Sequence, residues 1–445
     1  MNNTPLPKDI PLDLPLPEWL LVILLVVSFL AHIVFVNLMV GGSIATLWAE
    51  IKGLRNKEYD ILAQEIAATI TVNKSLAVVL GVAPLLSINA LYTIYFYTAN
   101  SLTGIMWILI IPMVAIVFLL TYLHKYTWEA MANMKLLHIA INALAVAMFL
   151  FIPLIFLVNV NLMLFPEKWM SVRGFLSALA LPNVFPRYFH FICASLALTG
   201  LFITWYMGRK NYPFEEYFQV FTRAKVKRIG YQLALGASVA QFLFGPIVMA
   251  TLPAKGFSWS MMGVILSGVA VAVYAVYYMI KTLRGSDTDL DKYFRRIVIS
   301  MSIVVVFMGS GRHVYRANAI NPHRELMAQK TAEFEQASKE AREQALNKQV
   351  EANEAKAAAE ASGDNTAKGK AVFNNYCAAC HKETSLLVGP PVTEMKEIYT
   401  DKKADLIKWI KSPGKKRPDA PQMPPFPQIN DTDMEDLTQY ILNIK

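Results

Sequence analysis

The sequence predicts an all-α protein: a polytopic transmembrane bundle of about eight helices, then a charged helical linker and a small C-terminal domain. The bundle follows from composition, because 55% of the residues are hydrophobic, mean hydropathy is +0.37 and only 17% are charged. Ordinary soluble proteins carry about 25% charged residues. It also follows from repeated apolar runs of about 20 residues, the length that crosses a bilayer as a helix. The linker and the last domain are predicted by an abrupt change of composition after the final run.

Eight apolar runs are expected to span the membrane, at residues 19–49, 72–98, 103–124, 133–160, 188–208, 228–251, 258–281 and 294–311. The N-terminus lacks the basic start and the small-residue cleavage site of a signal peptide. The first run is therefore expected to be a retained helix. Residues 1–18 would form an external segment, and residues 19–322 the transmembrane domain.

The basic residues indicate the orientation of the bundle. They concentrate in the loops after the first, third, fifth and seventh runs, as with Lys52, Arg55 and Lys57 after the first. Loops rich in Lys and Arg stay in the cytoplasm, so both termini are expected outside. This predicts a protein of the bacterial inner membrane whose C-terminal domain faces the periplasm. Because orientation explains the net charge of +9, no nucleic-acid partner is expected.

The segment after the last run differs from the bundle. Residues 323–365 are rich in Glu, Lys, Ala and Gln, which favour a solvated, semi-rigid helix. The residues SGDN at 362–365 are expected to end this linker. A compact domain should follow at residues 366–445.

The C-terminal domain contains a C-x-x-C-H segment, Cys377-Ala378-Ala379-Cys380-His381. Two thiols at this spacing add across the vinyl groups of a haem, and the adjacent histidine then lies under the iron as an axial ligand. The alternatives are a redox-active thiol pair and half of a zinc site. No strand–helix context supports the first, and the domain has no further Cys or His for the second. One covalent haem c is therefore predicted.

A methionine is the expected ligand on the other side of this iron, where it raises the reduction potential. Met395 and Met423 are the candidates. The layout resembles class I cytochrome c, with a helix near 366–376, the attachment segment, GPP at 389–391, a proline-rich loop around the second methionine and a closing helix. That resemblance implies Met423 as the ligand and Met395 as the lesser option.

Several histidines lie within the apolar runs, where ionisable groups are costly and are candidates for function. His32 lies in the middle of the first run, and His190 and His313 lie near the outer ends of the fifth and the eighth. Imidazole is the usual haem b ligand. With His138, these residues allow none, one or two haems b, and a hydrogen-bonded structural histidine is the alternative for each.

Two more histidines, His124 and His323, lie at helix ends. They are expected to be structural or solvated.

Residues 19–320 resemble subunit I of cytochrome bd oxidases. The similar segments occur in the same order: HIVFVNLMVGG at 32–42, a run from 138 to 166, RYFHFICASLALTGLFITWYM at 187–207 and GSGRHVYRANAI at 309–320. The resemblance implies that His190 binds a low-spin haem b opposite a methionine and that His32 binds a haem of a high-spin pair. It also implies that Arg312 lies near that pair.

The partner of His190 is left open by the sequence. Met261 or Met262 fits best, at the outer start of the seventh run, and Met249 is a rival. His313 is the alternative, in a bis-histidine site.

The chain departs from the resembled family at its catalytic positions. Residues 103–123 contain no Glu or Asp, and Gly309 stands where the family has a glutamate. The family's long external quinol-binding loop is reduced to residues 252–258, so quinone is only a candidate ligand. These departures favour an electron-transfer subunit over a complete oxidase.

The predicted function is therefore electron transfer between membrane haem b and external haem c, in a respiratory complex with companion transmembrane subunits and a soluble or membrane cytochrome as redox partner. The alternatives are a complete quinol-oxidising or oxygen-reducing enzyme and a tethered cytochrome c without haem b.

Overall fold

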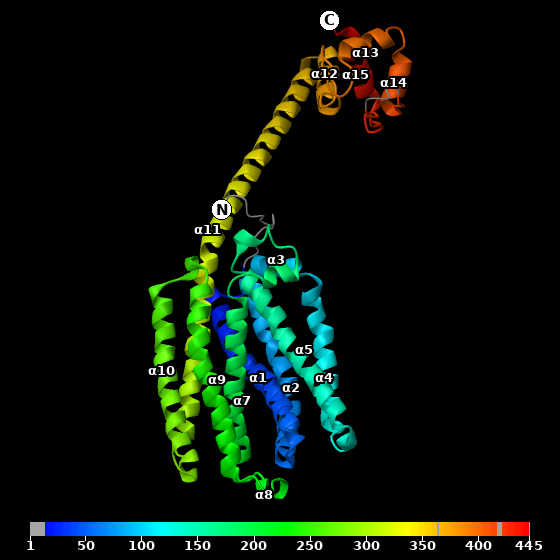
Figure 1. The fold of residues 1–445 in the computed structure, drawn as a ribbon. Coiled ribbons are helices and arrows are strands. Elements are labelled where there is room, and N and C mark those ends of the chain that lie inside the picture. Colours follow the sequence, from blue (N-terminus) through cyan, green and yellow to red (C-terminus); the bar gives the residue numbers. More distant parts are fainter. Residues whose placement is uncertain (1–13, 363–364, 416–420, 445) are drawn as a thin grey trace. The chain divides into compact units, whose positions relative to one another are not determined.

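The computed structural model describes residues 14–362, 365–415 and 421–444, and these are helices and connecting segments without β-strands (Figure 1). The chain divides into two compact units, Met1–Gln329 and Lys330–Lys445. The predicted all-α fold is confirmed.

Among the residues that the structure describes, seven helices are long and apolar enough to cross a membrane, and a bent helix pair makes up to eight. The long helices of the bundle are α1 (Glu18–Gly53), α2 (Lys57–Leu91), α4 (Ile105–Tyr126), α5 (Lys135–Leu162), α7 (Val184–Gly208), α9 (Arg223–Thr251), α10 (Trp259–Arg284) and α11 (Phe294–Ser362). The short helices are α3 (Thr93–Thr103), α6 (Phe175–Leu179) and α8 (Phe214–Tyr217). The predicted count of about eight spans agrees with this architecture.

The second predicted run, 72–98, is not one straight helix. The helix α2 ends at Leu91, Tyr92 has a non-helical backbone (φ −131°, ψ 38°), and α3 continues at an angle of 110°. Figure 1 shows α3 lying across one end of the bundle. Gly104, at φ +61°, then lets the chain turn into α4. The bend lets Tyr95, Phe96 and Ala99 enter the core at that end.

Small residues allow the central helices to approach closely. A Cβ on Gly41 of α1 would lie 2.2 Å from the backbone oxygen of Ser195 on α7. Between α7 and α9, a Cβ on Gly200 would lie 2.4 Å from the oxygen of Gly230. Such contacts are typical of helix pairs in membranes, where close packing rather than the hydrophobic effect holds the helices together.

The last apolar run and the predicted linker lie on a single helix. The helix α11 has 69 residues and contains Pro322 without ending there. The predicted span at 294–311 and the predicted helical linker at 323–365 are thus parts of one continuous helix. Composition marks where the surroundings of a helix change, but the backbone need not be interrupted there.

The C-terminal unit contains α12 (Asn365–Tyr376), α13 (Val392–Tyr399), α14 (Lys403–Lys411) and α15 (Asp431–Asn443). The predicted first and closing helices of this domain are confirmed by α12 and α15. They cross at Gly369, where a Cβ would lie 2.0 Å from the backbone oxygen of Asp436. The crossing closes a small core that includes Phe373, Cys377 and Leu437.

Candidate functional sites

The C-x-x-C-H segment forms a tight turn directly after α12. The backbone N–H groups of Cys380 and His381 both donate to the carbonyl oxygen of Cys377, at 3.0 and 2.9 Å. Cys377 is buried and Cys380 is exposed. The turn thus gathers two thiols and an imidazole on one short segment.

The thiol of Cys377 lacks the lowered pKa of a redox-active cysteine. Burial raises the pKa of the Cys377 thiol to about 11, and the nearby Cys380 adds to the rise. A reactive C-x-x-C pair needs a lowered thiol pKa, usually at the N-terminus of a helix. This geometry argues against the redox-pair alternative.

The imidazole of His381 is oriented as an iron ligand requires. Its Nδ1 lies 2.7 Å from the carbonyl oxygen of Pro390, which can only accept, so Nδ1 carries the hydrogen. The other nitrogen, Nε2, is then the deprotonated one that can bind a metal. Gly389 makes room for the ring, because a Cβ there would lie 2.1 Å from its Cε1. These residues fit a covalently held haem.

The two candidate methionines lie in the same unit. Met395, on α13, and Met423 both pack, partly buried, against the core that includes Cys377. The loop that carries Met423 is anchored to α14, because the N–H of Phe426 donates to the oxygen of Ile410 at 3.2 Å. The assignment of Met423 stays a prediction.

In the bundle, His190 projects from α7 toward α9. Its Cε1 lies 3.9 Å from the position of a Cβ on Gly245, and its buried Nδ1 has no hydrogen-bond partner among the described residues. Met249 lies one helical turn after Gly245 and so on the same face of α9. Met261 is 1% exposed and belongs to the core at this end of the bundle, and Met249 packs against that core.

His32 and His313 lie on neighbouring helices. The Nδ1 of His32 lies 2.8 Å from the backbone oxygen of Ala77, and Gly81 makes room for its ring. This bond leaves Nε2 of His32 as the nitrogen that can bind a metal. The buried Nδ1 of His313 has no hydrogen-bond partner in the part of the chain that the structure describes. Buried polar atoms rarely lack a hydrogen-bond partner, so an unpaired ring nitrogen of this kind is a candidate to bind a ligand.

Three arginines, Arg187, Arg312 and Arg316, form no ion pair with any carboxylate among the described residues. Arg312, next to His313, lies 5.0 Å from the ring of Phe29 on α1, and its buried Nε has no hydrogen-bond partner among the described residues. Phe29 is one turn before His32, so Arg312 reaches the helix of that histidine. Uncompensated cations in an apolar bundle suit an anionic group, such as the propionates of a haem.

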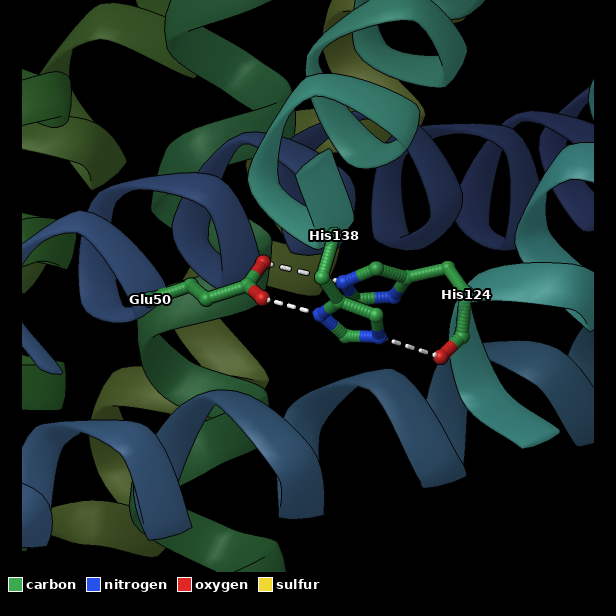
Figure 2. A group of neighbouring side chains, drawn as sticks. All are labelled: Glu50, His124 and His138. Carbon is green, nitrogen blue, oxygen red and sulfur yellow. Dashed lines mark hydrogen bonds and ion pairs between the residues drawn. The ribbon is translucent and has the colours of Figure 1, made fainter. Parts of the chain in front are cut away.

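The sequence reasoning missed a second polar cluster, at the other end of α1. Glu50, His124 and His138 are 0%, 3% and 0% exposed, and their ligating atoms lie within 4.8 Å of one another. Figure 2 shows both imidazoles meeting the Glu50 carboxylate, from helices α4 and α5. Of the two alternatives expected for His124, structural or solvated, its burial and its contact with Glu50 agree with the structural one. Both ring nitrogens of His138 are hydrogen-bonded, so His138 is not free to hold a haem.

The fold and the attachment turn define a membrane-anchored cytochrome. Residues 366–445 match the Cytochrome c family model, and they form a C-terminal cytochrome c domain for one covalent haem c. A solved structure, that of the bd oxidase from Geobacillus thermodenitrificans, is similar to the chain with a TM-score of 0.53 and 12% sequence identity. The match covers 68% of this chain and 87% of that one, and it shows a common fold for the membrane bundle. No curated protein sequence matches the chain.

Proposed function

We propose that this chain is the electron-transfer subunit of a respiratory membrane complex and passes electrons between haem b in its bundle and haem c in its C-terminal domain. The observation that carries the proposal is the combination of a haem c attachment turn with half-buried, unpaired histidines in a bundle of bd-oxidase fold. Haem, when bound, supplies a one-electron iron centre. The residues of the chain hold it, orient its ligands and set its charge environment.

In the C-terminal domain, Cys377 and Cys380 would hold haem c, and His381 and Met423 would be its axial ligands. In the bundle, His190 would hold a haem b. Two residues are proposed as the second axial ligand of this haem. Met249 shares the face of α9 that His190 meets, and Met261 is implied by the resemblance to subunit I of cytochrome bd oxidases. The bis-histidine alternative, His313, shares with His190 an unpaired buried Nδ1.

The chain supports electron transfer better than oxygen reduction. The helix α4 carries no carboxylate, and Leu30 lies 2.8 Å from the position of a Cβ on Gly309. The buried Glu50 does not replace the missing groups, because it lies 18 residues after His32 on α1, a rise of about 27 Å. Oxygen chemistry without proton-carrying carboxylates is difficult. We therefore assign any catalytic site to a companion transmembrane subunit.

The orientation is proposed from the charges of the loops. The basic ends of α1, α4, α7 and α10 would face the cytoplasm of a bacterium, with the cytochrome c domain on the periplasmic side. There the domain would meet a soluble or membrane cytochrome. A quinone site is not assigned, since the segment between α9 and α10 is short.

Variants of the bundle histidines test this proposal. In the purified full-length protein, His190→Ala should abolish a haem b signal in the reduced-minus-oxidised spectrum and leave haem c unchanged. The control is His323→Gln, at a buried histidine whose Nδ1 lies 3.0 Å from the hydroxyl of Tyr95. Met249→Leu and Met261→Leu distinguish the two proposed partners. An unchanged b signal in His190→Ala would overturn the assignment.

A further inference from the structure

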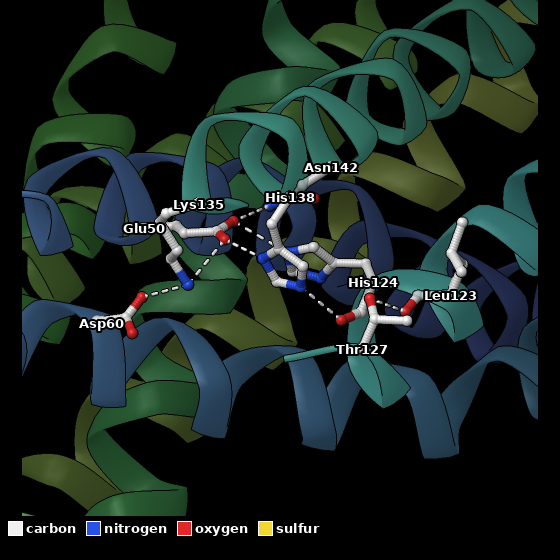
Figure 3. A network of polar contacts seen from close by, with 8 residues as sticks. All are labelled: Glu50, Asp60, Leu123, His124, Thr127, Lys135, His138 and Asn142. Carbon is white, nitrogen blue, oxygen red and sulfur yellow. Dashed lines mark hydrogen bonds and ion pairs between the residues drawn. The ribbon is translucent and has the colours of Figure 1, made fainter. Parts of the chain in front are cut away.

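The cluster at the inner end of α1 contains more than one ion pair. Figure 3 shows Glu50 at its centre, with Lys135, His138 and Asn142 from α5, His124 from α4 and Asp60 from α2 around it. Trp128 covers it, with its ring 4.8 Å from that of His138 and 4.0 Å from the Nζ of Lys135. The side chains of Glu50 and His138 are both 0% exposed.

The partners of His138 fix where its hydrogens lie. Its Nε2 is 2.8 Å from the backbone oxygen of His124, and since a carbonyl oxygen only accepts, Nε2 carries a hydrogen. Its Nδ1 contacts Oε1 of Glu50. A contact between a ring nitrogen and a carboxyl oxygen needs a proton between them. The Glu50–His138 pair therefore holds one proton beyond that of Nε2.

The surroundings of Glu50 decide which partner carries this proton. Its Oε1 also forms an ion pair with the Nζ of Lys135, at 3.1 Å. Its Oε2 lies 2.9 Å from Nε2 of His124 and accepts from the amide nitrogen of Asn142 at 3.3 Å. Lys135 and Asn142 can only donate through these nitrogens, and the positive charge of Lys135 favours the ionised form of the carboxyl, which only accepts. Glu50 is thus ionised, and the proton lies on His138.

The charges of the cluster then cancel. Lys135 contacts Asp60 at 2.6 Å, so two anions, Glu50 and Asp60, face two cations, Lys135 and His138, and a neutral His124 adds no charge. These are the titratable groups that face His138 from α1, α2, α4 and α5. An electroneutral set is the stable arrangement for charges in an apolar interior. Removal of one cation would leave an uncompensated negative charge.

The geometry suits a proton better than a metal ion. The rings of His124 and His138 are stacked, with centroids 4.1 Å apart and planes at 23°, so their nitrogens point side by side at the two oxygens of one carboxylate. The ligands of one ion would converge on a single point. The ammonium of Lys135 also occupies the position next to Glu50 and would repel a cation.

We propose that the Glu50–His138 pair is a buried proton-binding site at the end of the bundle that carries the basic loops. Lys135 and Asp60 connect it to the aqueous phase, because the side chain of Asp60 is 28% exposed. The site holds this proton as imidazolium between the Glu50 carboxylate and the backbone oxygen of His124. The proposal does not depend on haem b.

Infrared spectroscopy of the full-length protein in lipid nanodiscs tests this site, since the C=O stretch of a protonated carboxyl is distinct from that of a carboxylate. The wild type should show no protonated-carboxyl signal from Glu50 at neutral pH. His138→Gln removes one cation, so Glu50 should become protonated and one such signal should appear. The signal should be absent in the double variant Glu50→Gln/His138→Gln.

The control is Glu65→Gln in the His138→Gln background, which should keep the signal, because Glu65 belongs to a separate contact with the hydroxyl of Tyr212. If His138→Gln does not fold, Lys135→Met takes its place, since it removes the other cation and should give the same signal. A protonated-carboxyl signal in the wild type that Glu50→Gln abolishes would overturn the proposal. So would the absence of this signal from every folded variant that lacks His138 or Lys135. Stoichiometric metal that is lost in Glu50→Gln would also overturn it.

Discussion

The Nδ1 of His381 donates to the carbonyl oxygen of Pro390 at 2.7 Å, and this bond directs the other ring nitrogen away from the backbone. Pro390 belongs to the GPP segment after the attachment turn. A hydrogen bond to the distal nitrogen fixes the tautomer and orientation of a ligating histidine and raises its basicity. The segment around Pro390 would thus prepare His381 for its proposed role as an iron ligand.

Gly389→Ala should disturb this arrangement. The new Cβ would lie 2.1 Å from Cε1 of His381, so the ring or the backbone must move. We expect a loss of about 1–3 kcal/mol in the stability of the domain and less covalent haem c per chain, measured by thermal unfolding and pyridine haemochrome. Gly414→Ala is the matched control, since its Cβ would lie at an ordinary 3.5 Å from Trp409. Equal haem content in the two variants would contradict the prediction.

Met423→Leu should lower the reduction potential of haem c and remove the absorption band of methionine-ligated ferric haem, because thioether ligation favours the reduced iron. Met395→Leu should leave both nearly unchanged. Potentiometric titration of each variant measures the effect. The reverse pattern would assign Met395 as the ligand.

The ion pair of Glu383 gives the cytochrome c domain a pH dependence. The ammonium of Lys370, at 3.0 Å, and the hydroxyl of Tyr440, at 2.8 Å, lower the pKa of the Glu383 carboxyl. The stabilisation is complete above the unfolded pKa of about 4.3. It is lost as the pH falls toward the lower folded pKa.

The stability of the domain, measured by unfolding followed in the haem c absorption, should therefore depend less on pH in Glu383→Gln than in the wild type. The difference should appear below the unfolded pKa of about 4.3. The effect should be small because both partners are about half exposed. Glu397→Gln, at an exposed position of α13, serves as the control. An acid response identical to that of the wild type would contradict this account.

Arg312→Gln should lower the potential of haem b by tens of millivolts. A buried cation stabilises the extra electron of reduced haem, and Arg312 forms no ion pair among the described residues that would cancel its charge. Redox titration of the b band measures the shift. Arg296→Gln, near the N-terminus of α11, removes an equal charge beside Tyr278 and should leave the potential unchanged. A raised potential in Arg312→Gln would exclude this role.

Hydropathy predicted the membrane helices well, because length and apolar content are local properties. It failed at Tyr92, where the break between α2 and α3 depends on a single backbone conformation that lets Tyr95 and Phe96 enter the core. It also did not show that α11 is continuous through Pro322. Such features depend on tertiary packing, which a window of sequence does not contain.

The attachment segment could be recognised from the sequence because its chemistry lies within five consecutive residues. The Glu50 cluster could not, since His124 and His138 are 74 and 88 residues from Glu50. The available signals were a glutamate at the end of one apolar run and histidines at the ends of two others. Only the packing of α5 against both α1 and α4 shows that these ends meet.

The measurement that tests the central claim most directly is spectroscopy of the protein purified from membranes, by pyridine haemochrome and by reduced-minus-oxidised spectra with and without carbon monoxide. We expect one haem c per chain, a haem b signal and no response to carbon monoxide, since a low-spin, six-coordinate haem has no free position for it. A carbon-monoxide-sensitive b or d band would contradict the electron-transfer assignment and indicate an oxidase. Haem c alone would reduce the bundle to a membrane anchor.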